Sequence, residues 1–425
     1  MAETVVLLTL LYVVYLFGLS RRRRADLLPA PDDLVVVFTI PCLNEEAVIA
    51  GTLDSLLALP GEDHLVLVID DASDDRTGEL VRGYDDRRVQ LVRRELPNAR
   101  RGKGDALNAG IGFLRTSGLI AGRPRENVIV AVFDADGRIA PDALSQVGAY
   151  FRDPKAGAVQ IGVEIRNADT NLLARLQDME FTVFTEIFQR ARQRLGSVGL
   201  GGNGQFVRLS ALDSLGEAPW TDCLTEDLDL GVRLIMGGWK NHYCPTATVD
   251  QQAVTSIGRW LRQRSRWFQG HLQCWRLLPQ LLRAPIPARS MTDMVWYLML
   301  PVAVLLTPLV GLPVLLALAV LAVAAPHDAL RLLMADHGLP LLAIYLLSFG
   351  QAYLCAFVYW MRGRVGFRRA LVLAHAFELY SNLWLISGWW AVLNVARRRR
   401  RWYKTARVAE AVRPAQPTAV ERAAT

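Results

Sequence analysis

An apolar run at residues 128–133 ends in two carboxylates, Asp134 and Asp136, which are followed by Gly137. A run of this length that is rich in valine predicts a β-strand buried on both faces. Carboxylates at the carboxyl end of such a strand lie where open α/β sheets bind ligands, and paired oxygens there suit a divalent cation such as Mg²⁺ or Mn²⁺. The alternative is a plain polar turn, because Asp and Gly are also common turn residues.

Two earlier apolar runs also end in polar residues. The run at residues 34–40 is followed by Asn44, which we expect to cap a helix. The run at residues 65–69 ends in two consecutive aspartates, and a further helix is expected to open at Lys103. Strands that alternate with helices predict an α/β fold with a mostly parallel sheet covered on both faces.

Two later stretches permit both a structural and a functional interpretation. The glycine-rich turn at residues 199–204 either lets a ligand approach the backbone closely or is an ordinary loop, and it has no dinucleotide or Walker pattern. Thr225, Glu226 and Asp227 open a predicted helix that extends to about Met236. Acidic residues often occupy the first turn of a helix, so these residues either stabilise the helix start or present a general base from it.

Apolar residues concentrate at the N-terminus and after residue 292, which favours a membrane protein with a soluble insert. Residues 4–19 precede four arginines and predict an uncleaved anchor whose N-terminus lies outside. Residues 339–360 and 371–395 predict further spans. Residues 294–325 exceed the length of one span and form either one tilted helix or a hairpin that turns near Pro308.

The arginines leave a conflict in this topology. Arg362, Arg364, Arg368 and Arg369 lie between two predicted spans, and residues 397–401 follow the second of them. A single crossing cannot leave both groups on the cytoplasmic side of the membrane. Because the second group is denser, we expect a cytoplasmic C-terminal tail, and this favours the hairpin.

The stretch at residues 255–282 interleaves arginine with tryptophan and leucine, which is typical of an amphipathic helix on a membrane surface. Residues 171–194 predict a second amphipathic helix that packs on the core. The net charge of +7 comes from basic clusters beside apolar segments, so it favours a membrane surface over nucleic acid. The five cysteines show no paired spacing, which argues against a disulfide framework or a zinc site.

Five motifs in this order resemble those of the membrane-integrated family 2 glycosyltransferases. The group contains the cellulose, chitin, hyaluronan and poly-N-acetylglucosamine synthases. The motifs are PCLNEE at Pro41, DDASDD at Asp70, DAD at Asp134, TED at Thr225, and QRSRW at Gln263, which fits QxxRW. The resemblance covers residues 34–280 and then the membrane layout, and it implies a GT-A fold, a UDP-sugar donor, and Mg²⁺ or Mn²⁺.

The resemblance also implies a role for each matching residue. The nucleotide sugar would contact Pro41, Glu45, Asp70, Asp71, Lys103, Asp134, Gln263 and Arg266. Asp134 and Asp136 would hold the metal ion, and Asp227 would be the general base. The acceptor would contact Trp267, Asn203 and Glu226.

The organisation expected from these features has five parts. They are an N-terminal anchor helix at 1–25, a GT-A domain at 32–250, amphipathic interface helices with QxxRW at 251–290, transmembrane helices at 293–396, and a basic, disordered cytoplasmic tail at 397–425.

The expected function is inverting, metal-dependent transfer from a UDP-sugar to a growing polysaccharide. Synthesis would be coupled to export, with a possible accessory export protein, in a multi-pass plasma-membrane protein whose catalytic domain is cytoplasmic. Single transfer to a lipid acceptor is the first alternative. A catalytically silent scaffold that binds a nucleotide sugar is the second.

Overall fold

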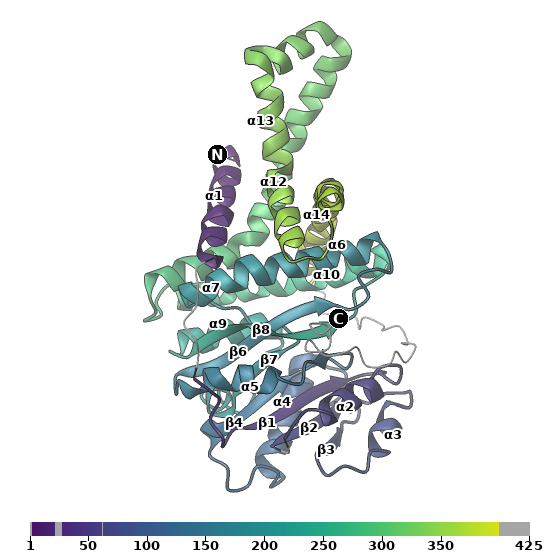
Figure 1. Ribbon diagram of the computed structural model, residues 1–425, viewed down its shortest axis with the longest axis vertical. Coiled ribbons are helices and arrows are strands. Elements are labelled where there is room, and N and C mark those ends of the chain that lie inside the picture. The colour runs from purple at the N-terminus through teal and green to yellow at the C-terminus, as the bar shows by residue number, and fades with distance from the viewer. Residues whose placement is uncertain (1, 22–27, 62, 399–425) are drawn as a thin grey trace, which may run out of the picture.

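The computed structural model of the protein describes residues 2–21, 28–61 and 63–398. Its centre is an eight-stranded sheet with the order β3-β2-β1-β4-β7-β6-β8-β5 (Figure 1). The strands are β1 (Val35–Cys42), β2 (His64–Asp70), β3 (Val89–Arg93), β4 (Val128–Val132), β5 (Arg138–Ile139), β6 (Ala156–Ile165), β7 (Gln205–Arg208) and β8 (Lys240–Gln251).

The first half of the sheet is parallel, as the alternation of strands and helices predicts. β1 pairs in parallel with both β2 and β4, and β3 extends this half beyond β2. β7 runs antiparallel between β4 and β6, and β8 pairs in parallel with β6. The register sets Cys42 opposite Asp70 and Thr39 opposite Val132, so β1, β2 and β4 end at the same edge.

Helices cover both faces of this sheet and rise above it. The α-helices are α1 (Ala2–Ser20), α2 (Ile49–Leu57), α3 (Thr77–Arg82), α4 (Lys103–Thr116), α5 (Ala143–Gly148), α6 (Leu172–Val183), α7 (Arg190–Leu195), α8 (Leu209–Asp213), α9 (Glu226–Met236), α10 (Ile257–Gln273), α11 (Leu278–Leu281), α12 (Ala288–Ala324), α13 (Pro326–Met361) and α14 (Phe367–Ala396). Short helices are η1 (Arg125–Asn127), η2 (Ala149–Arg152), η3 (Phe184–Gln189) and η4 (Cys274–Leu277).

Aromatic and aliphatic side chains fill both sides of the sheet. On one face the rings of Phe38 and Phe133 meet edge to face at a centroid distance of 5.1 Å, and Phe206 joins them. On the other face the β4 residues Val130 and Val132 pack in a core that includes residues of α4 and α9. Burial on both faces explains why β4 reads as a continuous apolar run.

The helix expected to begin at Asn44 starts later, at Ile49. Asn44 has a φ of 55°, and its Oδ1 accepts a hydrogen bond from the backbone N of Asp74 at 2.8 Å. The backbone N of Asn44 donates to Ser73 Oγ at 2.9 Å. The expected cap was therefore wrong, because Asn44 joins two neighbouring loops at the sheet edge instead of starting the helix.

The amphipathic helix expected at residues 171–194 is present as three consecutive pieces, α6, η3 and α7. Its first turn is capped by Asn171, whose Oδ1 accepts from the backbone N of Ala174 at 2.9 Å. The middle piece, η3, is π-helical. The basic stretch that follows β8 forms α10, as its amphipathic pattern predicts.

The expected hairpin near Pro308 was wrong, because α12 is a single helix of 37 residues. The chain turns instead after Ala325. α13 is kinked by the non-helical residues 335–338 and continues to Met361. Among the residues that the structure describes, three helices are long and apolar enough to cross a membrane, with candidate spans at Ala288–Leu306, Pro326–Leu346 and Phe367–Ala396. The arginines at 22–24 and residues 399–425, which include most of the expected disordered tail, lie outside the described residues.

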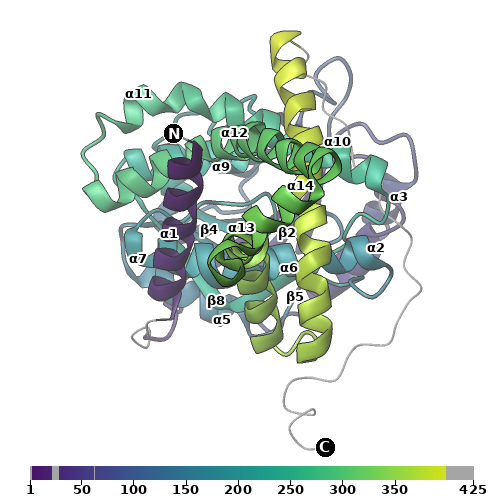
Figure 2. The same ribbon diagram turned by 90° about the horizontal axis from the view of Figure 1, so that it is seen from above.

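The molecule has three layers along its longest direction. The sheet domain lies at one end, α6 and α10 lie across it, and α1, α12 and α13 rise above them (Figure 1). Viewed from above, α14 is seen lengthwise across the molecule (Figure 2).

Candidate active site

The ends of the parallel strands bring several of the predicted residues together. Lys103, the first residue of α4, places its Nζ 2.7 Å from Asp134 Oδ1 and also donates to the carbonyl of Gly202. A Cβ atom on Gly202 would lie 3.2 Å from Lys103 Nζ and 3.3 Å from an Asp227 carboxylate oxygen. The glycine-rich turn is thus next to a cluster of Lys103, Asp134 and Asp227.

The turn after β4 is held from several elements of the fold. Asp136 is 1% exposed, and its Oδ2 accepts from the backbone N of Gln252 at 3.0 Å. Thr52 Oγ1 donates to the carbonyl of Ala135 at 2.6 Å. Asn203 accepts from the backbone N of Asp134 at 3.2 Å and donates to Gln251 at 3.2 Å. Asn203, expected to face the acceptor, therefore uses its amide to position the aspartate turn.

The two acids at the start of α9 lie in an unusual electrostatic environment. Burial raises the pKa of Glu226 to about 7, with a further contribution from the charge of Asp227, while Lys103 and Arg266 oppose the shift. Burial also raises the pKa of Asp227, against the Leu228 backbone N–H, Lys103 and Arg266. Groups with pKa values shifted in this way are typical of sites that transfer protons.

The aspartates at the end of β2 are held by arginines of β3 and the residue after it. Asp70 is fully buried, accepts from the backbone N of Ser73 at 2.8 Å, and pairs with Arg93. Asp71 pairs with Arg94 at 2.5 Å. Burial raises the pKa of Asp71, although Arg94 acts against the shift. The sequence did not indicate a role for either arginine, because only the pairing of β3 with β2 brings them to this edge of the sheet.

Pro41 and Glu45 lie at the same edge, where β1 leads into the loop before α2. Pro41 is half-buried opposite Ile69 of β2. Glu45 is buried, and its backbone N donates to Thr77 Oγ1 at 2.7 Å. The first motif is therefore bound to the loop that carries the second.

α10 closes the cluster from the side of the long apolar helices. Arg266 is half-buried and acts electrostatically on Glu226 and Asp227. Trp267 is also half-buried, and the guanidinium of Arg264 lies over its ring at 4.1 Å. Gln263 is half-buried on the same helix. All three QxxRW residues thus lie on one helix, and Arg266 is the one that acts on the acids of α9.

Arg264 is a residue whose importance the sequence does not indicate, because it stands at a variable position of QxxRW. It is 1% exposed and donates to Glu180 of α6 at 2.7 Å. Tyr380 of α14 donates to the same carboxylate. This triad joins α6, α10 and α14, which are far apart in the sequence.

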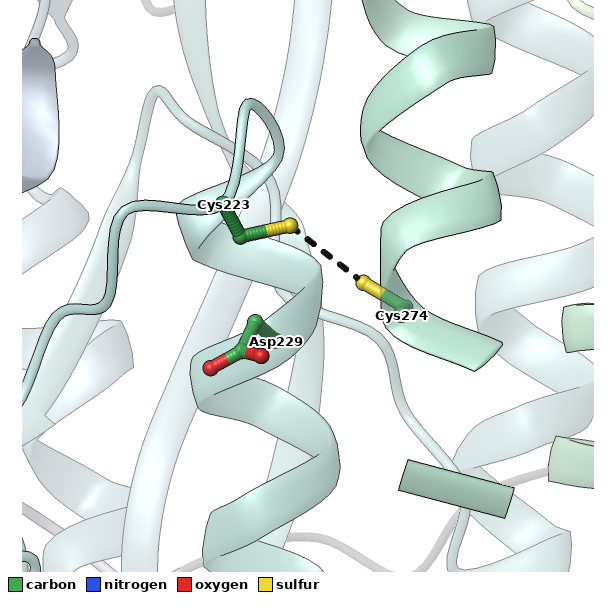
Figure 3. A group of neighbouring side chains, drawn as sticks. All are labelled: Cys223, Asp229 and Cys274. Carbon is green, nitrogen blue, oxygen red and sulfur yellow. Dashed lines mark hydrogen bonds between the residues drawn. The ribbon is translucent and has the colours of Figure 1, made fainter. Parts of the chain in front are cut away.

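A second cluster contains Cys223, Asp229 and Cys274 (Figure 3). The two sulfur atoms are 3.7 Å apart. Thiolates and a carboxylate are possible zinc ligands. However, the Asp229 oxygens already form ion pairs with Arg233 at 2.6 Å and Arg276 at 2.8 Å. We therefore assign this cluster a structural role, in which it connects the start of α9 to the end of α10.

Comparisons with known proteins show the family and the fold of the chain. The family model "Glycosyltransferase like family 2" matches residues 31–270. A beta-monoglucosyldiacylglycerol synthase of Synechocystis is 36% identical over 261 residues, which are 59% of this chain and 51% of the relative. A poly-beta-1,6-N-acetyl-D-glucosamine synthase of Staphylococcus aureus is 30% identical over 262 residues, 60% of each chain. The chain thus spans between about half and three fifths of the length of these relatives.

A solved structure supports the fold. The mannosyltransferase of Pyrobaculum calidifontis in complex with GDP-mannose and Mn²⁺ superposes with a TM-score of 0.64 at 19% identity, over 94% of this chain and 100% of that one. At this identity the likeness concerns the fold alone, a GT-A sheet with helices. Because the family match extends over more than half of the chain, the protein belongs to the glycosyltransferase-like family 2 and is a glycosyltransferase with a GT-A fold.

Proposed function

We propose that the protein is an inverting, metal-dependent glycosyltransferase that transfers a sugar from a UDP-sugar to a lipid of the diacylglycerol class at the membrane surface. The observation that carries the proposal is the cluster of Lys103, Asp134 and Asp227 next to Arg266 of α10, the helix that lies between the sheet domain and the apolar helices. The name of the Synechocystis relative supports the acceptor and makes glucose the first sugar to test.

The charges of this cluster suit a nucleoside diphosphate sugar. Lys103 and Arg266 bring positive charge to the place where a diphosphate would leave. Asp134 and Asp136 would hold Mg²⁺ or Mn²⁺, because carboxylate oxygens are the ligands these cations prefer and each carboxylate can accept several bonds. When bound, the cation offsets negative charge on the diphosphate.

Asp227 would accept the proton of the acceptor hydroxyl. As the hydroxyl oxygen bonds to the anomeric carbon, the bond from that carbon to the diphosphate breaks, and the nucleoside diphosphate leaves. A single displacement of this kind inverts the anomeric centre. An α-linked donor therefore gives a β-linked product, in agreement with the name of the Synechocystis relative.

Polysaccharide synthesis is the second candidate function. Trp267 favours it, since a flat indole ring in a QxxRW motif suits stacking on a sugar of a growing chain. The Staphylococcus aureus relative is named as the synthase of such a polymer. Against it, the Arg264 guanidinium already covers one face of Trp267. For either acceptor we propose a plasma-membrane protein with a cytoplasmic catalytic domain, where UDP-sugars are available.

The test uses the purified full chain in vesicles that contain diacylglycerol, with radiolabelled UDP-glucose, UDP-galactose and UDP-N-acetylglucosamine supplied separately. Label in the organic phase, as a lipid with one sugar, is the expected result. A water-soluble product that lengthens with time would replace the lipid acceptor with a polysaccharide. Trp267→Ala and Trp267→Phe extend the test: stacking predicts that only the alanine variant shortens a polymer, while hydrolysis of the donor by water persists in both.

A further inference from the structure

The helix α14 has the length of a membrane span but an unusual distribution of charge. It contains 30 residues, and its sequence is apolar enough to cross a membrane. Arg368 and Arg369 are exposed in its first turn, and Arg397 and Arg398 follow its last. A helix that crossed the membrane would leave one of these pairs on the side that basic residues avoid.

The turn before α14 is attached to the sheet domain. Arg364 pairs with Glu164 of β6 at 2.7 Å. Arg362 pairs with Glu186 of η3 at 3.5 Å. The first turn of α14 therefore lies close to the surface of the catalytic domain.

The middle of α14 lies on α10. Trp260 Nε1 donates to the hydroxyl of Tyr380 at 3.0 Å, and the ring of Trp260 also meets the ring of Trp384 edge to face. Two turns further along each helix, a Cβ atom on Gly388 would lie 3.0 Å from the ring of Phe268. α14 thus contacts α10 at Trp260 and again at Phe268, on the helix that carries QxxRW.

The remaining length of α14 is too short for a crossing. Gly388 contacts α10, and the helix ends at Ala396, about 12 Å further on at the rise of an α-helix. The hydrocarbon core of a bilayer is about 30 Å thick. Since the start and the middle of α14 both contact the catalytic domain or its interface helices, its last turns cannot reach the far side.

The outer face of α14 suits a lipid surface. Its exposed apolar residues recur every seven positions, at Val372, Leu379, Ile386 and Leu393. Trp389 and Trp390 are also exposed, and tryptophan is enriched where membranes meet water. The exposed polar side chains of His375 and Asn382 follow a neighbouring stripe, which would be costly at the centre of a bilayer.

We infer that α14 lies in the plane of the membrane surface on the catalytic side, with its apolar stripe in the lipid and its terminal arginines on anionic head groups. Both arginine groups are then on the same side of the membrane, which removes the conflict found in the sequence. In this position α14 holds α10, and with it QxxRW, against the bilayer. This position of α14 does not depend on which acceptor the enzyme uses.

The first test locates the C-terminal end of α14 in the full-length protein. Arg398→Cys is compared with Arg123→Cys in the sheet domain and Arg331→Cys at the tip between α12 and α13, all at exposed positions. The five natural cysteines are buried, so the unmodified chain is the blank. A membrane-impermeant maleimide is applied to intact cells and to inverted vesicles. We expect Arg398→Cys to react from the same side as Arg123→Cys, whereas reaction from the side of Arg331→Cys would overturn the proposal.

The second test measures depth directly in vesicles with and without anionic lipid. Spin labels are placed singly at Val372, Leu379, Ile386 and Leu393, and their relaxation by oxygen and by a water-soluble nickel complex is compared. A helix in the surface plane gives four similar, shallow depths. A maximum of depth at Leu379 and Ile386 would show a span, and dipolar broadening between molecules would show a second copy on this face. Either result would refute the lipid contact.

Discussion

The ammonium of Lys103 lies 2.7 Å from the carboxylate of Asp134, at the point where α4 begins and β4 ends. Burial by itself would lower the pKa of Lys103, but Asp134, Glu226 and Asp227 together raise it. The lysine in turn lowers the pKa of Glu226 and of Asp227. One positive charge therefore links the aspartate turn to the acids of α9.

Replacing this lysine is expected to change the pH dependence of catalysis. In Lys103→Met the pKa values of Asp227 and Glu226 rise further, because a charge that favours their ionised forms is lost. The acidic limb of kcat/KM should then move to higher pH. Lys155→Met, at an exposed position, is the matched control and should leave the profile unchanged. If Lys103→Met lowers the rate equally at every pH, the lysine acts on the substrate alone.

Asp136→Asn should abolish transfer and leave the fold intact. The amide keeps the shape and one oxygen acceptor, but it removes the charge that would hold a divalent cation. We expect no detectable turnover, with an unchanged melting temperature. Asp85→Asn, an exposed aspartate, is the control. Full activity of the natural chain in excess EDTA would contradict a metal requirement.

Asp227 and its neighbour Glu226 can be separated by their amides. Asp227→Asn should bind UDP-sugar normally and lose turnover by roughly 10²-fold or more, the usual range for a general base. Glu226→Gln should retain turnover and the acidic limb, which lies above the usual range for aspartate because burial raises the pKa of Asp227. It should lose only a second titration near pH 7, that of Glu226. Normal turnover in Asp227→Asn would mean that Asp227 merely stabilises the start of α9.

The packing of α10 on the segment before α9 depends on Gly270. A Cβ atom there would lie 2.5 Å from the backbone N of Thr225 and 2.7 Å from its side chain. Gly270→Ala should cost about 1–3 kcal/mol of unfolding free energy through overpacking, and it should displace QxxRW from Asp227. Gly258→Ala on the same helix is the control, since its Cβ would come no closer than 3.8 Å to Arg262. Equal melting temperatures for the two variants would show that the contact can relax.

The sequence by itself predicted the parallel half of the sheet and the elements that carry the motifs. β4 and its two aspartates could be predicted because a strand buried on both faces leaves a local signature, an apolar run that stops at a polar turn. Short-range patterns likewise predict the start of α4 at Lys103, the start of α9 at Glu226 and the amphipathic helix α10.

Contacts between distant segments were decided only by the tertiary structure. Asparagine is a common helix cap, yet hydrogen bonds between Asn44 and the loop at 73–74 hold it in a turn. Gln252 reaches Asp136 through its backbone, so its residue type gave no signal. The hydropathy of a helix shows how apolar it is, but it does not show which other helices pack against it. The position of α14 on α10 therefore follows from the packing of Tyr380 and Trp384 against Trp260, which no local pattern of residues encodes.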